Sequence, residues 1–330
     1  MAESMSVILL LLVLTSYKMS CLHAQDLPIL MPHYYEKSCP CAFPIIRNEM
    51  HLALLKDPRM AASLLRLQFH DCFVQGCDAS LLLDDTPTLR GEKTANANIN
   101  SARGFDVIDL IKTKLESECP GVVSCADIIT IAARDAVLLS GGPYWEVSLG
   151  RKDSSTASFN DANNNIPTPN SNLQTLITSF QKQGLSTVDM VALLGGHTIG
   201  NARCQNIRPR IYNNSASMAF SEPHLSMVKA ACPPSGNDNG VWPLDFPTPI
   251  LFDNSYYINL VRGLGLLNSD QTLYSEGSET KEIVESYAHD PLGFWKQFSE
   301  SMVKMSNIVD PLTFVTGEVR KNCRTVNDPL

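Results

Sequence analysis

The chain has 330 residues, of which 18% are charged and 44% hydrophobic. This composition excludes a disordered tail, a collagen-like repeat and a protein with many membrane spans. The 26 Lys and Arg against 34 Asp and Glu give a net charge of -8, which argues against a nucleic-acid-binding protein.

The N-terminus carries an apolar run from Val7 to Leu14. The run has the length of the hydrophobic region of a secretory signal peptide and is too short to span a bilayer. We expect cleavage after Ala24, which divides the chain into a signal peptide (residues 1–24) and a single domain (residues 25–330). The alternative is an ordinary buried N-terminal helix. Because no later run is long enough to cross a membrane, we expect a secreted, extracellular protein without a membrane span.

Ten cysteines in a secreted chain favour disulfides. Cys21 falls in the signal peptide, which leaves nine, an odd number. A zinc ribbon requires repeated close pairs of cysteines, and the close pairs at 39/41 and 72/77 do not repeat. One cysteine should therefore remain unpaired.

Helix ends and helical periodicity predict a mainly α fold. Asp57 and Pro58 predict an N-cap and first turn for a helix that continues towards Phe73. Two capping boxes precede further helices, each of which ends at a glycine pair. The boxes are Ser124 with Asp127 and Ser186 with Asp189, and the glycine pairs are Gly141–Gly142 and Gly195–Gly196.

The remaining pattern assigns one more helix, one short strand and two loops. Residues at helical spacing mark the helix and alternating residues mark the strand. The helix residues are Phe294, Phe298, Met302 and Met305, and the strand residues are Trp145, Val147 and Leu149. Stretches 160–169 and 233–249 are rich in Asn and Pro and indicate ordered loops, or linkers. Asn213 begins the sequon found, which predicts a glycosylated surface loop, although one sequon also occurs by chance.

Four residues with contrasting chemistry share one face of the helix that precedes Phe73. Arg66, Phe69, His70 and Phe73 stand at i, i+3, i+4 and i+7. Taken alone, this face could be a core stripe with one hydrogen-bonded His and an Arg that reaches to solvent. The loop at 71–80 follows at once, and its two cysteines can close a tight turn rich in oxygen ligands of the kind that Ca²⁺ prefers.

Residues 66–80, RLQFHDCFVQGCDAS, resemble the distal haem motif of the secretory plant (class III) peroxidases. Further motifs of that family follow in order at 98–105, 124–128, 195–200, 252–254 and 269–271, so the resemblance covers nearly all of residues 25–330. The acidic composition is most similar to that of the lignin-forming anionic members. The resemblance implies a mainly α haem-peroxidase fold with very little strand, haem b between distal and proximal helical lobes, four disulfides and two Ca²⁺ ions.

On the proximal side, the resemblance implies that His197 is the axial ligand of the haem iron and that Asp270 accepts a hydrogen bond from its other ring nitrogen. The glycine pair before His197 would let the ring leave the helix surface. Without the resemblance, a His at a helix end is more often a surface residue that interacts with the helix dipole.

On the distal side, the resemblance implies that His70 is the general base that moves a proton between the two oxygens of H₂O₂. Arg66 would stabilise the negative charge that develops as the O–O bond breaks. Asn98 would fix the tautomer of His70, Glu92 would link this region to the distal ion, and Phe69 would shield the haem edge.

The resemblance also implies the metal ligands and the disulfides. The distal Ca²⁺ ligands would be Asp71, Val74, Gly76, Asp78 and Ser80, and the proximal ones Thr198, Asp245, Thr248, Leu251 and Asp253. The alternative for the proximal set is a polar loop that binds its own backbone. The disulfides would be Cys39–Cys119, Cys72–Cys77, Cys125–Cys323 and Cys204–Cys232.

Several residues depart from the family pattern. They are Gln68, where His is common; Lys152, where Arg is usual; Pro247, between two proximal calcium ligands; and Cys41, which has no partner in the family. Cys41 should be a free thiol, and the apolar residues after it favour a buried one.

The sequence therefore predicts a secreted, monomeric haem peroxidase of the cell wall. It would use H₂O₂ to oxidise phenolic donors in one-electron steps, as in lignin or suberin formation, with Pro167 as the donor contact. Two rivals are a haem-binding wall protein without turnover and a secreted calcium-binding adhesion module. Retention of Arg66, His70 and Asn98 argues against the first, and His197 with Asp270 argues against the second.

Overall fold

The computed structural model describes residues 30–212 and 222–328. The predicted signal peptide and Asn213 lie outside these ranges. The α-helices are α2 (Ala42–Lys56), α3 (Met60–Cys72), α4 (Phe105–Glu118), α5 (Cys125–Leu139), α6 (Phe159–Asn165), α7 (Leu173–Lys182), α8 (Thr187–Leu194), α9 (Cys204–Ile211), α10 (Glu222–Ala231), α11 (Ser255–Val261), α12 (Asn268–Ser275), α13 (Ser278–His289), α14 (Pro291–Ser306) and α15 (Pro311–Thr316). Two 3₁₀ helices, η1 (Ser80–Leu82) and η2 (Gly195–Thr198), and two short strands, β1 (Asn201–Arg203) and β2 (Val241–Pro243), complete the described elements.

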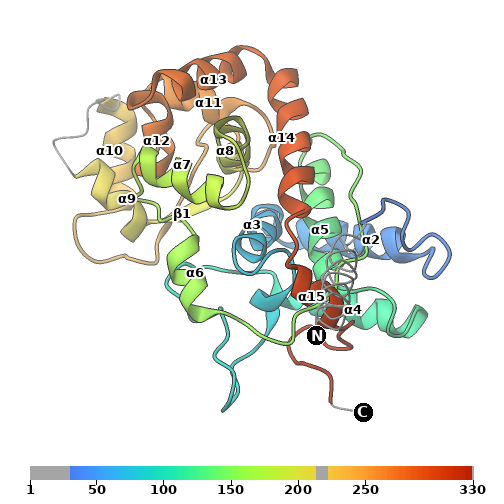
Figure 1. The fold of residues 1–330 in the computed structure, drawn as a ribbon. Helices are drawn as coiled ribbons and strands as arrows, with labels where there is room; N and C mark the ends of the chain where they lie inside the picture. Colours follow the sequence, from blue (N-terminus) through green and yellow to red (C-terminus); the bar gives the residue numbers. More distant parts are fainter. Residues whose placement is uncertain (1–29, 213–221, 329–330) are drawn as a thin grey trace, which may run out of the picture.

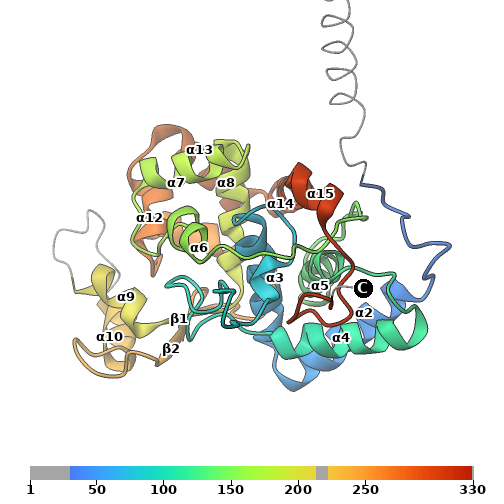
Figure 2. The same cartoon turned by 60° about the horizontal axis from the view of Figure 1, so that its bottom comes forward.

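The helices form two lobes on either side of α3 and α14 (Figures 1 and 2). The first lobe contains α2, α4 and α5, which pack on one another, and α3 packs against α5. The second lobe contains α7, α8 and α11–α13, and α14 packs against both α8 and α3. This arrangement confirms the predicted mainly α fold and places η2 of the second lobe against α3 of the first.

The two predicted capping boxes differ in the structure. Ser186 and Asp189 exchange both bonds of a capping box at the start of α8. Ser124 accepts a hydrogen bond from the backbone N–H of Asp127, as expected, but Asp127 does not return it. Its carboxylate instead accepts from the Tyr35 hydroxyl at 2.7 Å and from the Gly150 N–H at 2.7 Å. Residues distant in the chain therefore bind the Asp127 carboxylate that the predicted capping box would have used.

The predicted start of α3 was wrong by a few residues. Asp57 is the C-cap of α2, and its side chain accepts a hydrogen bond from the backbone N–H of Arg59. The backbone N–H of Met60 also binds the Asp57 carbonyl, so residues 57–60 form a tight turn between two helices. Arg103 makes an ion pair with the Asp57 carboxylate, which holds this turn against the segment that leads into α4.

The predicted strand and one predicted loop were also wrong. Trp145, Val147 and Leu149 are buried, but only Leu149 pairs with another segment, through a single bridge to Met31. The stretch at 160–169 begins inside helix α6. The strand pairing within the described residues joins β1 to β2, antiparallel, with Ala202 opposite Trp242. The alternation of apolar residues at 145–149 reflects burial of one side of an extended segment. Within the described residues, no neighbouring strand pairs along this segment to form a sheet.

The core lies along α5 and α14. Thirteen residues of α5 are buried without a break from Cys125 to Val137, because helices cover it on several sides. Phe294, Phe298 and Met302 are buried on α14, as their spacing predicts. A second, smaller core lies under α9 and includes the Cys204–Cys232 disulfide.

All four expected disulfides are present, with Cα–Cα separations of 5.7, 4.0, 5.7 and 5.0 Å for Cys39–Cys119, Cys72–Cys77, Cys125–Cys323 and Cys204–Cys232. Cys41 is a free thiol, as expected, but it is half-buried rather than buried. Its Sγ lies 3.6 Å from Cys119 Sγ and 3.8 Å from Cys39 Sγ. The apolar side chains after it pack against the core, while residue 41 stands before the first turn of α2.

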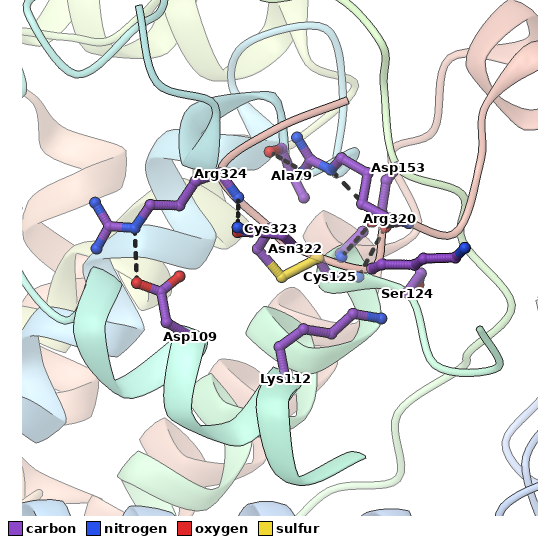
Figure 3. Close-up of a disulfide and its surroundings, with 12 residues drawn as sticks. Ala79, Asp109, Lys112, Ser124, Cys125, Asp153, Arg320, Asn322, Cys323 and Arg324 are labelled. Carbon is purple, nitrogen blue, oxygen red and sulfur yellow. Dashed lines mark hydrogen bonds and ion pairs between the residues drawn. A yellow bond between two sulfur atoms is a disulfide. The ribbon is translucent and has the colours of Figure 1, made fainter. Parts of the chain in front are cut away.

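Figure 3 shows how the disulfide between Cys125 and Cys323 fixes the C-terminal segment. Beside it, the Asp153 carboxylate accepts from the backbone N–H groups of Cys125 and Arg320, at 3.0 and 2.9 Å. The guanidinium of Arg320 reaches the Ala79 carbonyl at 2.6 Å. One buried network therefore joins the start of α5, the C-terminal segment and the 71–80 loop.

Candidate active site and metal-binding loops

The turn that carries His197 depends on a glycine at position 195. The chain leaves α8 as the 3₁₀ turn η2. A Cβ on Gly195 would lie 2.2 Å from the Tyr257 hydroxyl and 2.6 Å from the Phe294 ring. Any larger residue would therefore displace the turn and the His197 ring with it.

His197, which is partly exposed, pairs with the buried Asp270 in the second lobe. His197 Nδ1 lies 2.8 Å from Asp270 Oδ1, and Asp270, on α12, is only 2% exposed. Burial alone would lower the pKa of His197, but the Asp270 carboxylate outweighs it and raises the pKa above its usual value. With Nδ1 bound to the carboxylate, Nε2 is the nitrogen left to bind another group.

His70 is held in the opposite lobe by Asn98. His70 Nδ1 lies 2.5 Å from Asn98 Oδ1, and the Asn98 amide donates in turn to the backbone carbonyl of Glu92 at 2.9 Å. Because the amide oxygen can only accept, Nδ1 carries the proton and Nε2 is the free base. Burial and the nearby Arg66 charge hold the pKa of His70 well below its usual range, so the ring is neutral at neutral pH.

Arg66 remains a cation beside His70. Its Nη2 donates to the Ala97 carbonyl at 2.7 Å and to Ser101 Oγ at 3.2 Å. Burial, together with the charge of Arg203, lowers the pKa of Arg66 to about 10. The guanidinium is therefore charged and fixed in direction at neutral pH.

The charged groups near the two histidines fit an anionic cofactor such as haem. The His197 side chain is 35% exposed, so the packing of the protein leaves part of this ring uncovered. Arg203, at the end of β1, is close enough to Arg66 to lower its pKa, and Arg203 Nε is buried without a hydrogen-bond partner among the described residues. Two clustered guanidinium groups call for an anion between them.

Arg203, Ser101 and Tyr256 were not identified from the sequence. Arg203 lies six residues after His197, but its effect on the pKa of Arg66 depends on the tertiary fold, which brings β1 near α3. Ser101 is in the segment after Asn98, where no pattern distinguishes its hydroxyl. The Tyr256 hydroxyl reaches Asp270 from another helix, a contact that no local spacing reveals.

Aromatic side chains and a proline-containing loop border this region. The Phe69 ring lies 4.3 Å from Phe73 and 6.0 Å from Phe180, measured between centroids. Pro167 is half-buried, two residues before the Pro169 carbonyl, which accepts from the backbone N–H of Ser269 at 3.0 Å. The loop is therefore tied to the start of α12, next to Asp270.

The structure brings the distal calcium candidates together as a cluster of unsatisfied oxygens. Four buried atoms have no hydrogen-bond partner within residues 30–212 and 222–328: Asp71 Oδ1, Asp78 Oδ2, Ser80 Oγ and Glu92 Oε2. Burial raises the pKa of Asp71 to about 7 and that of Glu92 to about 8, and the charge of Asp71 contributes to the second shift. Burial and the charge of Asp71 also raise the pKa of Asp78. Such a cluster fits a hard divalent cation that supplies the missing positive charge.

The other two distal candidates can contribute only backbone carbonyls. Val74 is buried, and Gly76 has a φ of +85°, which favours glycine. A Cβ on Gly76 would also lie 3.0 Å from the Ile308 carbonyl, just beyond α14. Glycine at position 76 thus lets the loop turn tightly beneath the end of α14.

The proximal calcium candidates surround the Thr198 hydroxyl. It donates to Asp245 Oδ2 at 2.9 Å or to Asp253 Oδ1 at 3.1 Å. Burial and the charge of Asp253 raise the pKa of Asp245 to about 6. Thr248 Oγ1 lies 3.5 Å from the same Asp245 oxygen, whereas the Leu251 side chain is exposed and only its backbone could bind. These oxygens make a compact set, although part of their bonding capacity is met within the loop.

Comparison with known proteins identifies relatives over nearly the whole chain. The family model described as Peroxidase matches residues 46–290. The chain is 54% identical over 311 residues to Peroxidase 11 of Arabidopsis thaliana, covering 92% of each chain. It is 48% identical over 334 residues to Peroxidase 72 of Arabidopsis thaliana, covering 99% of each. It is 54% identical over 301 residues to Peroxidase 4 of Vitis vinifera, covering 90% of this chain and 92% of that protein.

Among the described residues, no helix has both the length and the apolar character needed to cross a bilayer.

Proposed function

Because the chain belongs to the secretory plant peroxidases and is an H₂O₂-dependent oxidoreductase, we propose that His70, Arg66 and Asn98 carry out its reaction with H₂O₂, with His197 as the axial ligand of haem b. The observation that carries this assignment is the pair of oppositely tuned histidines. The pKa of His70 is held low beside a cation, and that of His197 is raised by a carboxylate.

The distal residues act on the proton and the charge of H₂O₂. His70 Nε2 takes a proton from one peroxide oxygen and returns it to the other, which departs as water. Asn98 keeps Nδ1 protonated, so the base always faces the substrate. The Arg66 guanidinium, fixed by the Ala97 carbonyl, stabilises negative charge on the departing oxygen, an interaction worth several kcal/mol in comparable sites.

The proximal residues set the electron density of the axial ligand. Asp270 draws the Nδ1 proton of His197 towards itself and gives the ring imidazolate character. When bound, haem would supply the redox chemistry: H₂O₂ oxidises it by two electrons, and two donor molecules, each oxidised by one electron, return it to its resting state. Arg203 and Arg66 would offset the negative charge of its carboxylates.

We further propose two Ca²⁺ sites, at the residues named above. The orphaned oxygens of Asp71, Asp78, Ser80 and Glu92 support the distal one. Asp71 follows His70 directly and Thr198 follows His197, so each ion would hold a loop that adjoins an active-site ring. Loss of an ion should therefore disturb the ring beside it.

The donor, location and assembly are proposals as well. Small phenols would be oxidised near Pro167, as in lignin or suberin polymerisation. The predicted signal peptide and the disulfides support secretion to the cell wall, and the domain should act as a monomer. The sequon at Asn213 would carry a glycan.

The reaction of the purified holoenzyme with H₂O₂ in stopped flow tests the distal assignment. His70→Ala and Arg66→Leu should bind haem normally but react about 10² to 10⁴ times more slowly, as for loss of a general base or a charge-stabilising group. His51→Ala, on the exposed face of α2, is the matched control. Near-normal rates in both active-site variants would refute the assignment, and unchanged spectra on addition of H₂O₂ to the wild type would favour a haem-binding protein without turnover.

A further inference from the structure

Tyr256 is a fully buried tyrosine whose hydroxyl is bound to the carboxylate behind His197. It lies on α11, is 3% exposed, and donates to Asp270 Oδ1 at 3.2 Å. His197 Nδ1 binds the same oxygen at 2.8 Å. The ring centroids of His197 and Tyr256 are 6.2 Å apart, in an edge-on arrangement. One carboxylate oxygen therefore accepts from two side chains that come from different helices.

We propose that Tyr256 is a positioning residue that limits how strongly Asp270 draws the proton of His197. A hydrogen bond to a carboxylate stabilises its charge and lowers its affinity for protons. The second donor on Oδ1 thus weakens the bond from Nδ1 and reduces the imidazolate character of the axial ligand. This inference rests on the proposed assignment of His197.

The position of Tyr256 is set by the candidate proximal calcium loop. Asp253 Oδ1 accepts from the backbone N–H of Ser255 at 2.7 Å and from Thr198 Oγ1 at 3.1 Å. Ser255 begins α11, so Tyr256 is the second residue of this helix. Thr198 in turn follows His197 in the chain. Together with the chain bonds between neighbouring residues, these contacts form a closed cycle that runs from His197 through Thr198, Asp253, Ser255, Tyr256 and Asp270 back to His197.

This cycle of contacts separates two effects on the axial ligand. Thr198 and Asp253 fix where the His197 backbone lies, whereas the Tyr256 hydroxyl adjusts the strength of a single hydrogen bond. Removing only the hydroxyl, in Tyr256→Phe, leaves the buried ring and its packing. Asp270 Oδ1 then accepts from His197 Nδ1 alone, and this stronger hydrogen bond favours the ferric over the ferrous state of bound haem.

The experiment compares the holoenzyme with Tyr256→Phe, Tyr257→Phe and Asp270→Asn. The measurements are the iron–histidine stretching frequency of the ferrous protein by resonance Raman spectroscopy, and the midpoint potential. Tyr257→Phe is the matched control, because this adjacent hydroxyl is equally buried but donates to the Val191 and Ala192 carbonyls at 2.9 and 3.3 Å.

Tyr256→Phe should raise the stretching frequency and shift the ferric-to-ferrous ratio about threefold towards ferric, which corresponds to about 28 mV for one electron. Asp270→Asn should move both quantities in the opposite direction, and Tyr257→Phe should change neither. No change in Tyr256→Phe, a change in the direction of Asp270→Asn, or an equal change in Tyr257→Phe would overturn the proposal for Tyr256 alone. If Asp270→Asn leaves both quantities unchanged, the assignment of His197 fails and the proposal with it.

Discussion

Removal of calcium from the distal loop should make the stability of the protein depend strongly on pH. Without the ion, the carboxylates of Asp71 and Glu92 are buried close together, and burial raises their pKa values from 3.8 to about 7 and from 4.5 to about 8. A carboxyl whose pKa is raised on folding binds its proton more tightly in the folded state, so the calcium-free protein loses stability as the pH rises. For these two carboxyls the loss should run from about pH 4 to about pH 8.

The size of the loss follows from the two shifts. One pKa unit corresponds to about 1.36 kcal/mol, so ionising either carboxyl in the folded protein costs about 4 to 5 kcal/mol. The charge of Asp71 contributes to the shift of Glu92, and the two costs therefore overlap. We expect a total of about 5 to 9 kcal/mol between pH 4 and pH 8. A bound Ca²⁺ replaces the protons, so its stabilising effect should grow with pH over the same range.

Urea denaturation followed by circular dichroism, with excess calcium or excess chelator, measures this effect at pH 5, 6, 7 and 8. In excess chelator, Glu92→Gln should reduce the loss of unfolding free energy between pH 5 and pH 8 by about 2 kcal/mol or more. The amide still accepts a hydrogen bond from the Ser158 N–H but carries no charge. Glu118→Gln, at the exposed end of α4, is the control and should follow the wild type. Equal stability of the chelated wild type at pH 5 and pH 8, or identical curves for the two variants, would contradict this prediction.

Three further outcomes follow from the fold and the proposed site. His197→Ala should hold little haem because it lacks the axial ligand, whereas His289→Ala, on the surface of α13, should keep full haem content; a normal ferric spectrum in the first variant would contradict the assignment. Replacing Cys125 and Cys323 by Ala should lower the unfolding free energy by about 5 kcal/mol in urea denaturation, because the bond closes a loop of 198 residues, and a loss below about 1 kcal/mol would count against this. Mass mapping under denaturing, non-reducing conditions should find one alkylatable thiol at Cys41, and a peptide that joins it to another cysteine would show a different pairing.

The features that could be predicted from the sequence are those that local geometry controls. Helical spacing placed Arg66, Phe69 and His70 on one face of a single helix, since the repeat of 3.6 residues fixes such neighbours without help from the rest of the chain. The capping box at Ser186 formed as predicted because its two partners are three residues apart. The family motifs were recognisable for the same reason, as each is a short run of residues.

Contacts between segments far apart in the chain depend on how the helices pack, and no local pattern predicts them. The Asp127 carboxylate binds the Tyr35 hydroxyl instead of completing its expected capping box, and the Tyr256 hydroxyl binds Asp270. The packing of separate parts of the chain sets both distances. The tertiary fold likewise brings the charge of Arg203 close enough to Arg66 to lower its pKa. Local patterns specify which side chains share a helix face, but the distance between two faces depends on the volume of everything packed between them.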